Sequence, residues 1–285
     1  MTRRDFLDAA VLRLSTAGVE DARRTAEWIV EHATGARRVD LYLRPDAELG
    51  PAERALAERY LARREAGEPV QYVVGSADFY GLRLTVTPAV LIPRPETETV
   101  VEHALGLVRD AESPWVLDMG TGSGAIALAV KSQRPDAEVF GVDASPAALA
   151  VAAANAERLG LDVTFVEADL LRPSFADEVP AAFTLVVSNP PYVARAERDG
   201  LQREVRDHEP DQALFVPDDD PLLFYRVLAD RAEHLLVPGG WLVAETHAER
   251  GRAVAALWTE AGLEDVEVRP DLAGRDRVAV ARRPA

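Results

Sequence analysis

The second half of the chain alternates apolar runs with segments of helical pattern, and this alternation constrains the fold more than any other feature. The runs of strand length lie at residues 115–118, 138–142, 163–166, 183–188 and 240–245, and the helical patterns at about 123–134, 146–159, 173–179, 221–236 and 249–262. Such alternation predicts a mostly parallel sheet with helices on both faces. Two more strands are expected at 265–269 and 276–281, and the turn DLAGRD between them is too short for a parallel crossover. We therefore predict an α/β fold with a seven-stranded, mostly parallel sheet in which one of the last two strands runs antiparallel.

The first part of the chain has no strand pattern. Residues 1–70 carry apolar side chains at helical spacing, and Pro51 can open a helix there, so a small helical bundle is expected. Residues 71–93 are rich in β-branched and aromatic residues interrupted by glycine and proline, which predicts a β-hairpin connector. The α/β domain is then expected to occupy residues 94–285.

The composition restricts the class of protein. Of the 285 residues, 48 are acidic and 32 are basic, and there is no cysteine. A net charge of -16 repels phosphate backbones, so we expect no direct binding of nucleic acid. Disulfides and thiolate metal sites are excluded. No apolar run reaches membrane-spanning length and the charged N-terminus does not resemble a secretory signal, so a cytoplasmic protein with no membrane association is expected.

The segment VLDMGTGSGAIALAV joins the first main strand to its helix. Gly120, Gly122 and Gly124 allow a tight turn and a close approach of the backbone to a ligand. Their spacing also satisfies the relaxed dinucleotide fingerprint, so the loop by itself does not separate nicotinamide enzymes from other nucleoside binders. Asp143, at the end of the next strand, can accept hydrogen bonds from both ribose hydroxyls in either class.

Asp118 favours one of these classes. A carboxylate immediately before the glycines would repel the pyrophosphate of a dinucleotide, whereas it suits the amino group and sulfonium of S-adenosylmethionine. Asp169 follows the third strand, where it can accept a hydrogen bond from the adenine amino group, and Leu170 can pack against the ring. There are purely structural alternatives to these binding roles. The glycines could form a tight turn without a ligand, and Asp169 could simply cap a helix.

The stretch LVVSNPPYVA places two rigid residues at the end of a strand. In an open parallel sheet, ligands bind outside the carboxyl ends of the strands, which is where Asn189 is expected. Pro190 and Pro191 restrict the backbone, so the Asn189 side chain and the Pro190 carbonyl form two fixed acceptors that can hold both hydrogens of an NH2 group. Tyr192 offers a flat surface for a planar substrate. Held in this way, a poorly nucleophilic amide nitrogen can be aimed at an activated methyl group, so that catalysis is mostly positioning and electrostatic preorganisation.

At this point the chain resembles a known family, the release-factor glutamine N5-methyltransferases. The similar segments, in the same order, are PVQYVVGSADFYGLRLTVTPAVLIPRPETETVVEHAL, DMGTGSGAIALAV, VSNPPYV, HEPDQAL and DLAGRDRVAVA. The resemblance implies a Rossmann-like methyltransferase fold and, as substrate, the glutamine of the Gly-Gly-Gln motif in class I peptide release factors. It also implies that the protein uses S-adenosyl-L-methionine, releases S-adenosyl-L-homocysteine, and docks the release factor with its N-terminal helices. A monomer is expected. With the reasoning above, the expected cofactor residues are Asp118, Gly120, Thr121, Gly122, Ser123, Gly124, Asp143, Asp169, Leu170 and Asn189. The expected substrate residues are Asn189, Pro190, Pro191 and Tyr192, of which Asn189, Pro190 and Tyr192 are expected to be catalytic.

Three alternatives stay open on the residues alone. The recipient could be a glutamine in a ribosomal protein, or the amino group of a nucleic-acid base, since Asn-Pro-Pro-Tyr also resembles the enzymes that modify adenine and cytosine. The chain could also be a binding or assembly factor that keeps the fold without turnover. The sequence departs from the family where FVPDDDP follows HEPDQAL and where His247 occupies the position of a glycine.

A few other polar residues are candidates for secondary roles. Arg94, Glu96 and Thr97 can line the substrate entrance, or Glu96 and Thr97 can simply begin a helix. Glu209 is expected to support the Asn-Pro-Pro-Tyr loop without being catalytic. The five histidines form no metal-ligand pair, so no metal site is expected.

Overall fold

A computed structural model describes residues 1–175 and 177–285. The chain forms two compact units, of which the first comprises Met1–Ser76 with Gln202–His208 and the second comprises Ala77–Leu201 with Glu209–Ala285. The segment 202–208 thus leaves the second unit, joins the first and returns. Each unit is described by itself.

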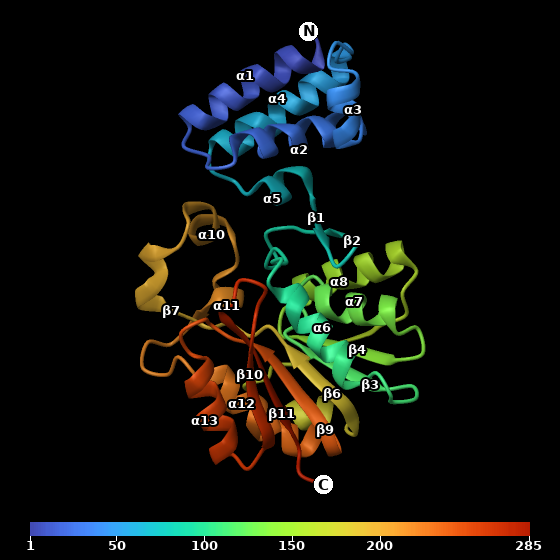
Figure 1. Cartoon of the computed structure of the whole chain (residues 1–285), viewed down its shortest axis with the longest axis vertical. Coiled ribbons are helices and arrows are strands. Elements are labelled where there is room, and N and C mark those ends of the chain that lie inside the picture. The colour runs from blue at the N-terminus through green and yellow to red at the C-terminus, as the bar shows by residue number, and fades with distance from the viewer. The chain divides into compact units, whose positions relative to one another are not determined.

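The first unit is a bundle of helices around an apolar core (Figure 1). Its helices are α1 (Arg3–Thr16), α2 (Ala22–Thr34), α3 (Arg38–Leu43), α4 (Pro51–Glu65), α5 (Val70–Val74) and α10 (Arg203–His208). The helices begin where local chemistry favours it: Thr2 and Asp21 cap α1 and α2 with their side chains, and Pro51 is the first residue of α4. The buried side chain of Arg64 pairs with Glu204 at 2.5 Å, which attaches α10 to this unit.

A single β-hairpin follows, formed by β1 (Ser76–Phe79) and β2 (Leu82–Thr85). The prediction of strand structure from residue 71 is wrong at 71–74, which form the one-turn helix α5. Pro69 precedes this helix and Gly75, in the left-handed conformation, ends it. These two residues limit the β-branched residues between them to a single helical turn.

The second unit contains a seven-stranded sheet of order β10-β11-β9-β6-β3-β4-β5. The strands are β3 (Trp115–Met119), β4 (Glu138–Asp143), β5 (Thr164–Glu167), β6 (Phe183–Ser188), β9 (Leu236–Glu245), β10 (Glu264–Pro270) and β11 (Asp276–Arg282). β11 runs antiparallel to both of its neighbours, whereas the pairs among β5, β4, β3, β6 and β9 are parallel. The predicted α/β fold with its one antiparallel strand is confirmed.

Helices cover both faces of this sheet (Figure 1). Residues of α6 (Thr97–Leu107), α7 (Ala125–Gln133) and α8 (Pro146–Leu159) belong to one apolar core, and residues of α9 (Phe175–Glu178), α12 (Leu223–Leu235) and α13 (Gly251–Glu260) belong to the other. The central strands are buried on both sides, as expected for parallel strands between two helical layers. The remaining short elements are β7 (Val193–Ala194), η1 (Arg195–Gly200), α11 (Asp211–Leu214) and β8 (Phe215–Val216).

The strand order reverses between β3 and β6, because the chain proceeds from β3 to β4 on one side and continues with β6 on the other. At such a switch point the loops at the carboxyl ends of the strands diverge and leave room for a ligand. The carboxyl ends of β3, β4, β5 and β6, with the loops that follow them, carry the predicted site residues.

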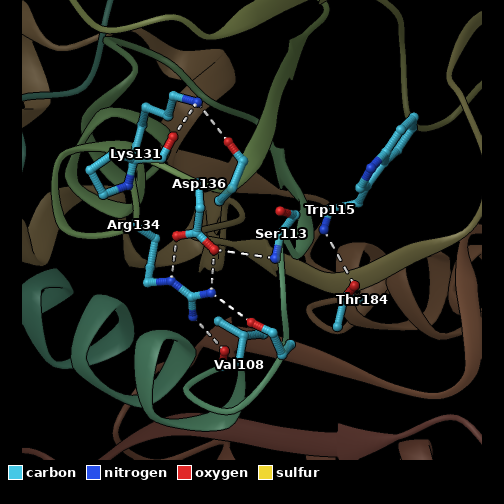
Figure 2. Close-up of polar contacts among 10 residues, drawn as sticks. Val108, Ser113, Trp115, Lys131, Arg134, Asp136 and Thr184 are labelled. Carbon is cyan, nitrogen blue, oxygen red and sulfur yellow. Dashed lines mark hydrogen bonds and ion pairs between the residues drawn. The ribbon is translucent and has the colours of Figure 1, made fainter.

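A polar cluster lies at the amino ends of β3 and β4, opposite the predicted site (Figure 2). Arg134 makes two hydrogen bonds of 2.8 Å with Asp136 and donates to the carbonyls of Val108 at 2.6 Å and Ala111 at 2.7 Å. Asp136 also accepts from the Ser113 amide. Because Val108 ends α6, this cluster fixes the end of α6 that is remote from the predicted site.

Among the described residues, no helix combines the length and apolar character that crossing a bilayer requires.

Candidate active site

A cavity of about 410 Å³ lies in the second unit, at the carboxyl ends of the parallel strands. Its volume is in the range of small-molecule sites. Every predicted cofactor residue except Gly124 lines it, together with the predicted substrate residue Pro191. The other wall residues include Val90, Leu91, Pro93, Thr97, Ser145, Gln212 and Phe224.

The glycine loop forms one wall of the cavity. Gly120 and Gly122 have φ angles of 75° and 56°, which L side chains adopt only with strain. A Cβ atom at either position would meet no atom within 4 Å, so the loop presents bare backbone to open space. The amides of Gly120 and Thr121 donate to the Val142 carbonyl, which attaches the loop to the end of β4.

Gly124 packs closely against two helices. It precedes α7, and a Cβ there would lie 3.1 Å from Leu128 Cδ1 and 3.3 Å from Ala152 Cβ. Glycine at this position therefore permits close packing of α7 against α8. Gly124 is not part of the cavity wall, and contact between Gly124 and a ligand stays a prediction.

Asp118 is almost fully buried and has one oxygen without a protein partner. Its Oδ2 accepts from Thr121 Oγ1 at 2.7 Å and from the Ala127 amide at 3.1 Å. Its Oδ1 has no hydrogen-bond partner among the described residues. Burial raises the pKa of Asp118 to about 7, against the effect of the two hydrogen bonds, and the charge of Asp143 adds to the rise. A buried acceptor in a cavity wall is satisfied when a cationic or hydrogen-bonding ligand reaches it.

Asp143 lies at the end of β4 and is held by backbone amides. Its two oxygens accept from Gly122 and from Ser145, each at 2.9 Å. Burial raises the pKa of Asp143, and these hydrogen bonds oppose the rise. The carboxylate is thus fixed in direction at the cavity wall.

Asp169 and Leu170 follow β5 and also line the cavity. Asp169 accepts from the Leu171 amide at 2.9 Å, and its other oxygen lies 3.5 Å from Arg172. These contacts stabilise the local turn, as a purely structural aspartate would. Asp169 also lies in the cavity wall, where a ligand can reach it.

The Asn-Pro-Pro-Tyr loop is only partly at the cavity. Asn189 and Pro191 line it, whereas Pro190 is buried and Tyr192 packs against the core beneath α12 and α13. Asn189 Nδ2 donates to Thr97 Oγ1 at 3.2 Å, so its Oδ1 is the atom left to accept from a ligand. The Tyr192 hydroxyl donates to Glu245 at 3.2 Å, and its ring contacts His247 edge to face. A stacking role for Tyr192 stays a prediction.

Two residues that support the loops of the site were not predicted, because their partners are distant in the chain. Glu245 ends β9 in a run that is otherwise apolar, and it receives hydrogen bonds from both Thr97 and Tyr192. Asn155 lies on the buried face of α8, where its side chain bonds both backbone groups of Thr85 and donates to the Ser123 carbonyl in the glycine loop. A lone polar residue on an apolar strand or helix face is the signal that could have identified both.

The connector near the cavity is fixed by Glu209. Its buried carboxylate accepts from the Ile92 amide at 3.2 Å and from the Arg94 guanidinium. The neighbouring residues Val90, Leu91 and Pro93 belong to the cavity wall. These two contacts of Glu209 run to Ile92 in the connector and to Arg94 directly after it. Of the three predicted entrance residues, Thr97 lines the cavity.

No group of three or more His, Cys, Asp and Glu side chains suited to a metal ion occurs in the part of the chain that the structure describes. His247, at the family's glycine position, uses Nδ1 to accept from the Glu249 amide and packs on Tyr192. This departure therefore lies beside the Asn-Pro-Pro-Tyr loop.

Comparison with known proteins agrees with this fold. Residues 103–205 match the family described as Methyltransferase small domain, and residues 5–75 match the PrmC N-terminal domain. A methyltransferase from Pyrococcus furiosus, 15% identical, has the same fold with a TM-score of 0.52 over 81% of this chain and 98% of that one. The switch-point cavity, the glycine loop and these matches define the chain as a methyltransferase.

Full-length relatives narrow this class. The release factor glutamine methyltransferase of Geobacter sulfurreducens is 43% identical over 281 residues, covering 99% of this chain and 96% of the relative. That of Cereibacter sphaeroides is 44% identical over 287 residues, covering both chains completely. The chain belongs to the release factor glutamine methyltransferase family.

Proposed function

We propose that this protein transfers a methyl group from S-adenosylmethionine to the side-chain amide nitrogen (N5) of the glutamine in the Gly-Gly-Gln motif of class I peptide release factors. The product of the donor is S-adenosylhomocysteine. The full-length similarity to proteins named release factor glutamine methyltransferases supports the reaction and the substrate class.

The residues of the cavity fit S-adenosylmethionine. The unpartnered Oδ1 of Asp118 suits the cationic methionyl end, where a bound positive charge would return the pKa of this carboxyl toward its usual range. Asp143 is oriented to accept from the ribose hydroxyls, and Asp169 with Leu170 suits the adenine amino group and ring. The bare backbone at Gly120 and Gly122 leaves room for the chain of the cofactor.

The protein's contribution to the reaction is positioning. When bound, S-adenosylmethionine supplies an activated methyl group. Asn189 Oδ1 and the Pro190 carbonyl accept the two hydrogens of the substrate amide, which holds the nitrogen lone pair in one direction. The nitrogen becomes acidic once it carries the methyl group, so its proton leaves to solvent and no side chain needs to act as a strong base. Tyr192 supports the amide plane.

The helical unit has a separate part in this proposal. We assign residues 1–70 to docking of the release factor, residues 71–93 to the connector and residues 94–285 to methyl transfer. The protein acts as a monomer in the cytoplasm, without binding nucleic acid directly.

The observation that carries the proposal within the site is Asn189, whose amide nitrogen is occupied by Thr97 while its oxygen is left for a ligand at the cavity wall. The test is incubation with S-adenosylmethionine labelled in its methyl group. We expect label on a class I release factor and none on the same factor with Gln→Ala in its Gly-Gly-Gln motif. Label on a ribosomal protein or on DNA or RNA, with an unlabelled release factor, would contradict the proposal.

A further inference from the structure

Glu245 is a buried carboxylate that lies between the two ends of the Asn-Pro-Pro-Tyr loop. It ends β9, which is paired with β6, and only 1% of its surface is exposed. Its Oε2 accepts from Thr97 Oγ1 at 2.5 Å and its Oε1 accepts from the Tyr192 hydroxyl at 3.2 Å. A buried carboxylate needs hydrogen-bond donors, and these two hydroxyls provide one to each oxygen.

This arrangement determines the direction of the next hydrogen bond. Thr97 has a single hydroxyl proton, and an ionised Glu245 can only accept, so this proton points to Glu245 and Thr97 Oγ1 can only accept from any other partner. The other partner is Asn189 Nδ2, at 3.2 Å. The amide of Asn189 is therefore held in one of its two flip states, with Nδ2 toward Thr97.

Thr97 is itself fixed in place. It is the first residue of α6, its amide donates to the Arg94 carbonyl, and its side chain is buried. A β-branched side chain has few rotamers, so the hydroxyl is held in position. Helix α6 is fixed at its other end by the Arg134 cluster (Figure 2).

The far end of the loop is held by the same carboxylate. The Tyr192 hydroxyl donates to Glu245, and Arg250 donates to the Tyr192 carbonyl. Glu245 thus connects the residue before the two prolines, through Thr97, with the residue after them. The prolines stiffen the backbone between these two points.

We propose that Thr97 and Glu245 are positioning residues that set the amide of Asn189 so that its oxygen, and not its nitrogen, faces the substrate NH2 group. This inference rests on the proposed function, because only a substrate that donates two hydrogens requires an acceptor at this point. A flipped Asn189 amide would present its own N–H groups to the substrate N–H groups, and the hydrogen bond would be lost. Neither residue needs to touch the reacting atoms for this role.

The first test observes Asn189 directly and does not depend on activity. The side-chain NH2 signal of Asn189 is assigned in the ¹⁵N–¹H spectrum by its loss in N189A. We expect this signal to shift in T97V and in E245Q, and to stay near its wild-type position in T97S, which keeps the hydroxyl. T99V is the matched control, since Thr99 lies on the same helix two positions further and its side chain is outside the cavity wall. An Asn189 signal that is unchanged in both T97V and E245Q would overturn the inference.

The second test is kinetic and uses a class I release factor as substrate. T97V should lower kcat about tenfold, since one orienting hydrogen bond contributes about 1.4 kcal/mol, while the KM for the release factor and the Kd for S-adenosylmethionine change less than about threefold. T97S should recover most of the lost turnover. E245Q, which is isosteric, should also lower kcat, because a glutamine accepts with one atom and donates with the other.

A double-mutant comparison separates positioning from general structural damage. If Thr97 acts through Asn189, then T97V/N189A should turn over no more slowly than N189A alone. Losses that multiply would show that Thr97 acts elsewhere and would overturn the inference. A wild-type protein that methylates the release factor, with N189A impaired and T97V unimpaired, would contradict this inference alone. A wild-type protein that leaves the release factor unmodified would contradict the proposed function, and the Asn189 signal would then still test the contact.

Discussion

Replacing Asp118 by asparagine separates the cost of burying this carboxylate from its use in binding. Burial raises its pKa from 3.8 to about 7, and a difference of about 3 units corresponds to about 4 kcal/mol of unfavourable free energy in the free protein at high pH. Because the folded pKa lies above the unfolded value, this penalty is absent below about pH 4 and is complete only above about pH 7. D118N has no charge to bury, so its stability should not carry this pH dependence.

The expected magnitude follows from the two pH values chosen. At pH 5.5 the wild-type penalty has reached about 2 kcal/mol and at pH 8.5 about 4 kcal/mol. D118N should therefore gain about 2 kcal/mol in free energy of unfolding relative to wild type between these pH values, in the absence of cofactor. Urea unfolding followed by circular dichroism measures this difference. D162N, at an exposed aspartate before β5, is the control and should show no comparable gain.

The same substitution should weaken binding of the cofactor. A hydrogen bond between charged groups contributes about 1.5–3 kcal/mol, so the Kd for S-adenosylmethionine should rise roughly tenfold to a hundredfold in titration calorimetry. A D118N protein that shows no gain in free energy of unfolding relative to wild type between pH 5.5 and pH 8.5 would refute the assignment of a buried, unpartnered carboxylate. A Kd that does not change would remove Asp118 from the cofactor site.

Four further substitutions test other parts of the site. N189A should lower turnover at least about tenfold with a cofactor Kd within a few-fold of wild type, and unchanged turnover would remove its assigned role. D143A should raise the cofactor Kd about tenfold, and an unaffected Kd would exclude it from the ribose site. G122A should lower the melting temperature and weaken cofactor binding, because a φ of 56° at this position costs an L residue about 1–2 kcal/mol. An unchanged melting temperature would contradict the assignment of a strained backbone at Gly122. R134A should lower the melting temperature and leave the cofactor Kd unchanged, because its bonds to Val108 and Ala111 lie at the amino ends of the strands, opposite the cavity. A raised Kd would show that the two ends of the strands are coupled.

The sheet was predictable because its signal is local. Parallel strands buried on both faces are continuous apolar runs, and the intervening helices have their own period and caps. The strand predicted at 240–245 is longer in the structure, Leu236–Glu245, since it continues through two glycines and a proline that sequence patterns assign to turns. The helices α3, α5 and α10 were not predicted, because elements of five or six residues carry too little periodicity.

The site was predictable to the extent that its residues follow strands directly. Asp118, Asp143, Asp169 and Asn189 lie at or just after strand ends, and parallel topology brings such residues together. Glu245 could not be assigned in this way. Its partners are 148 and 53 residues away in the chain, so its role depends on tertiary contacts.

The most direct measurement is a crystal structure of the complex with S-adenosylhomocysteine and a peptide that contains Gly-Gly-Gln. The account predicts that the glutamine side-chain nitrogen lies about 3 Å from both Asn189 Oδ1 and the Pro190 carbonyl, facing the sulfur of the cofactor product. A glutamine bound elsewhere, or an Asn189 amide that turns its nitrogen toward the peptide, would contradict it.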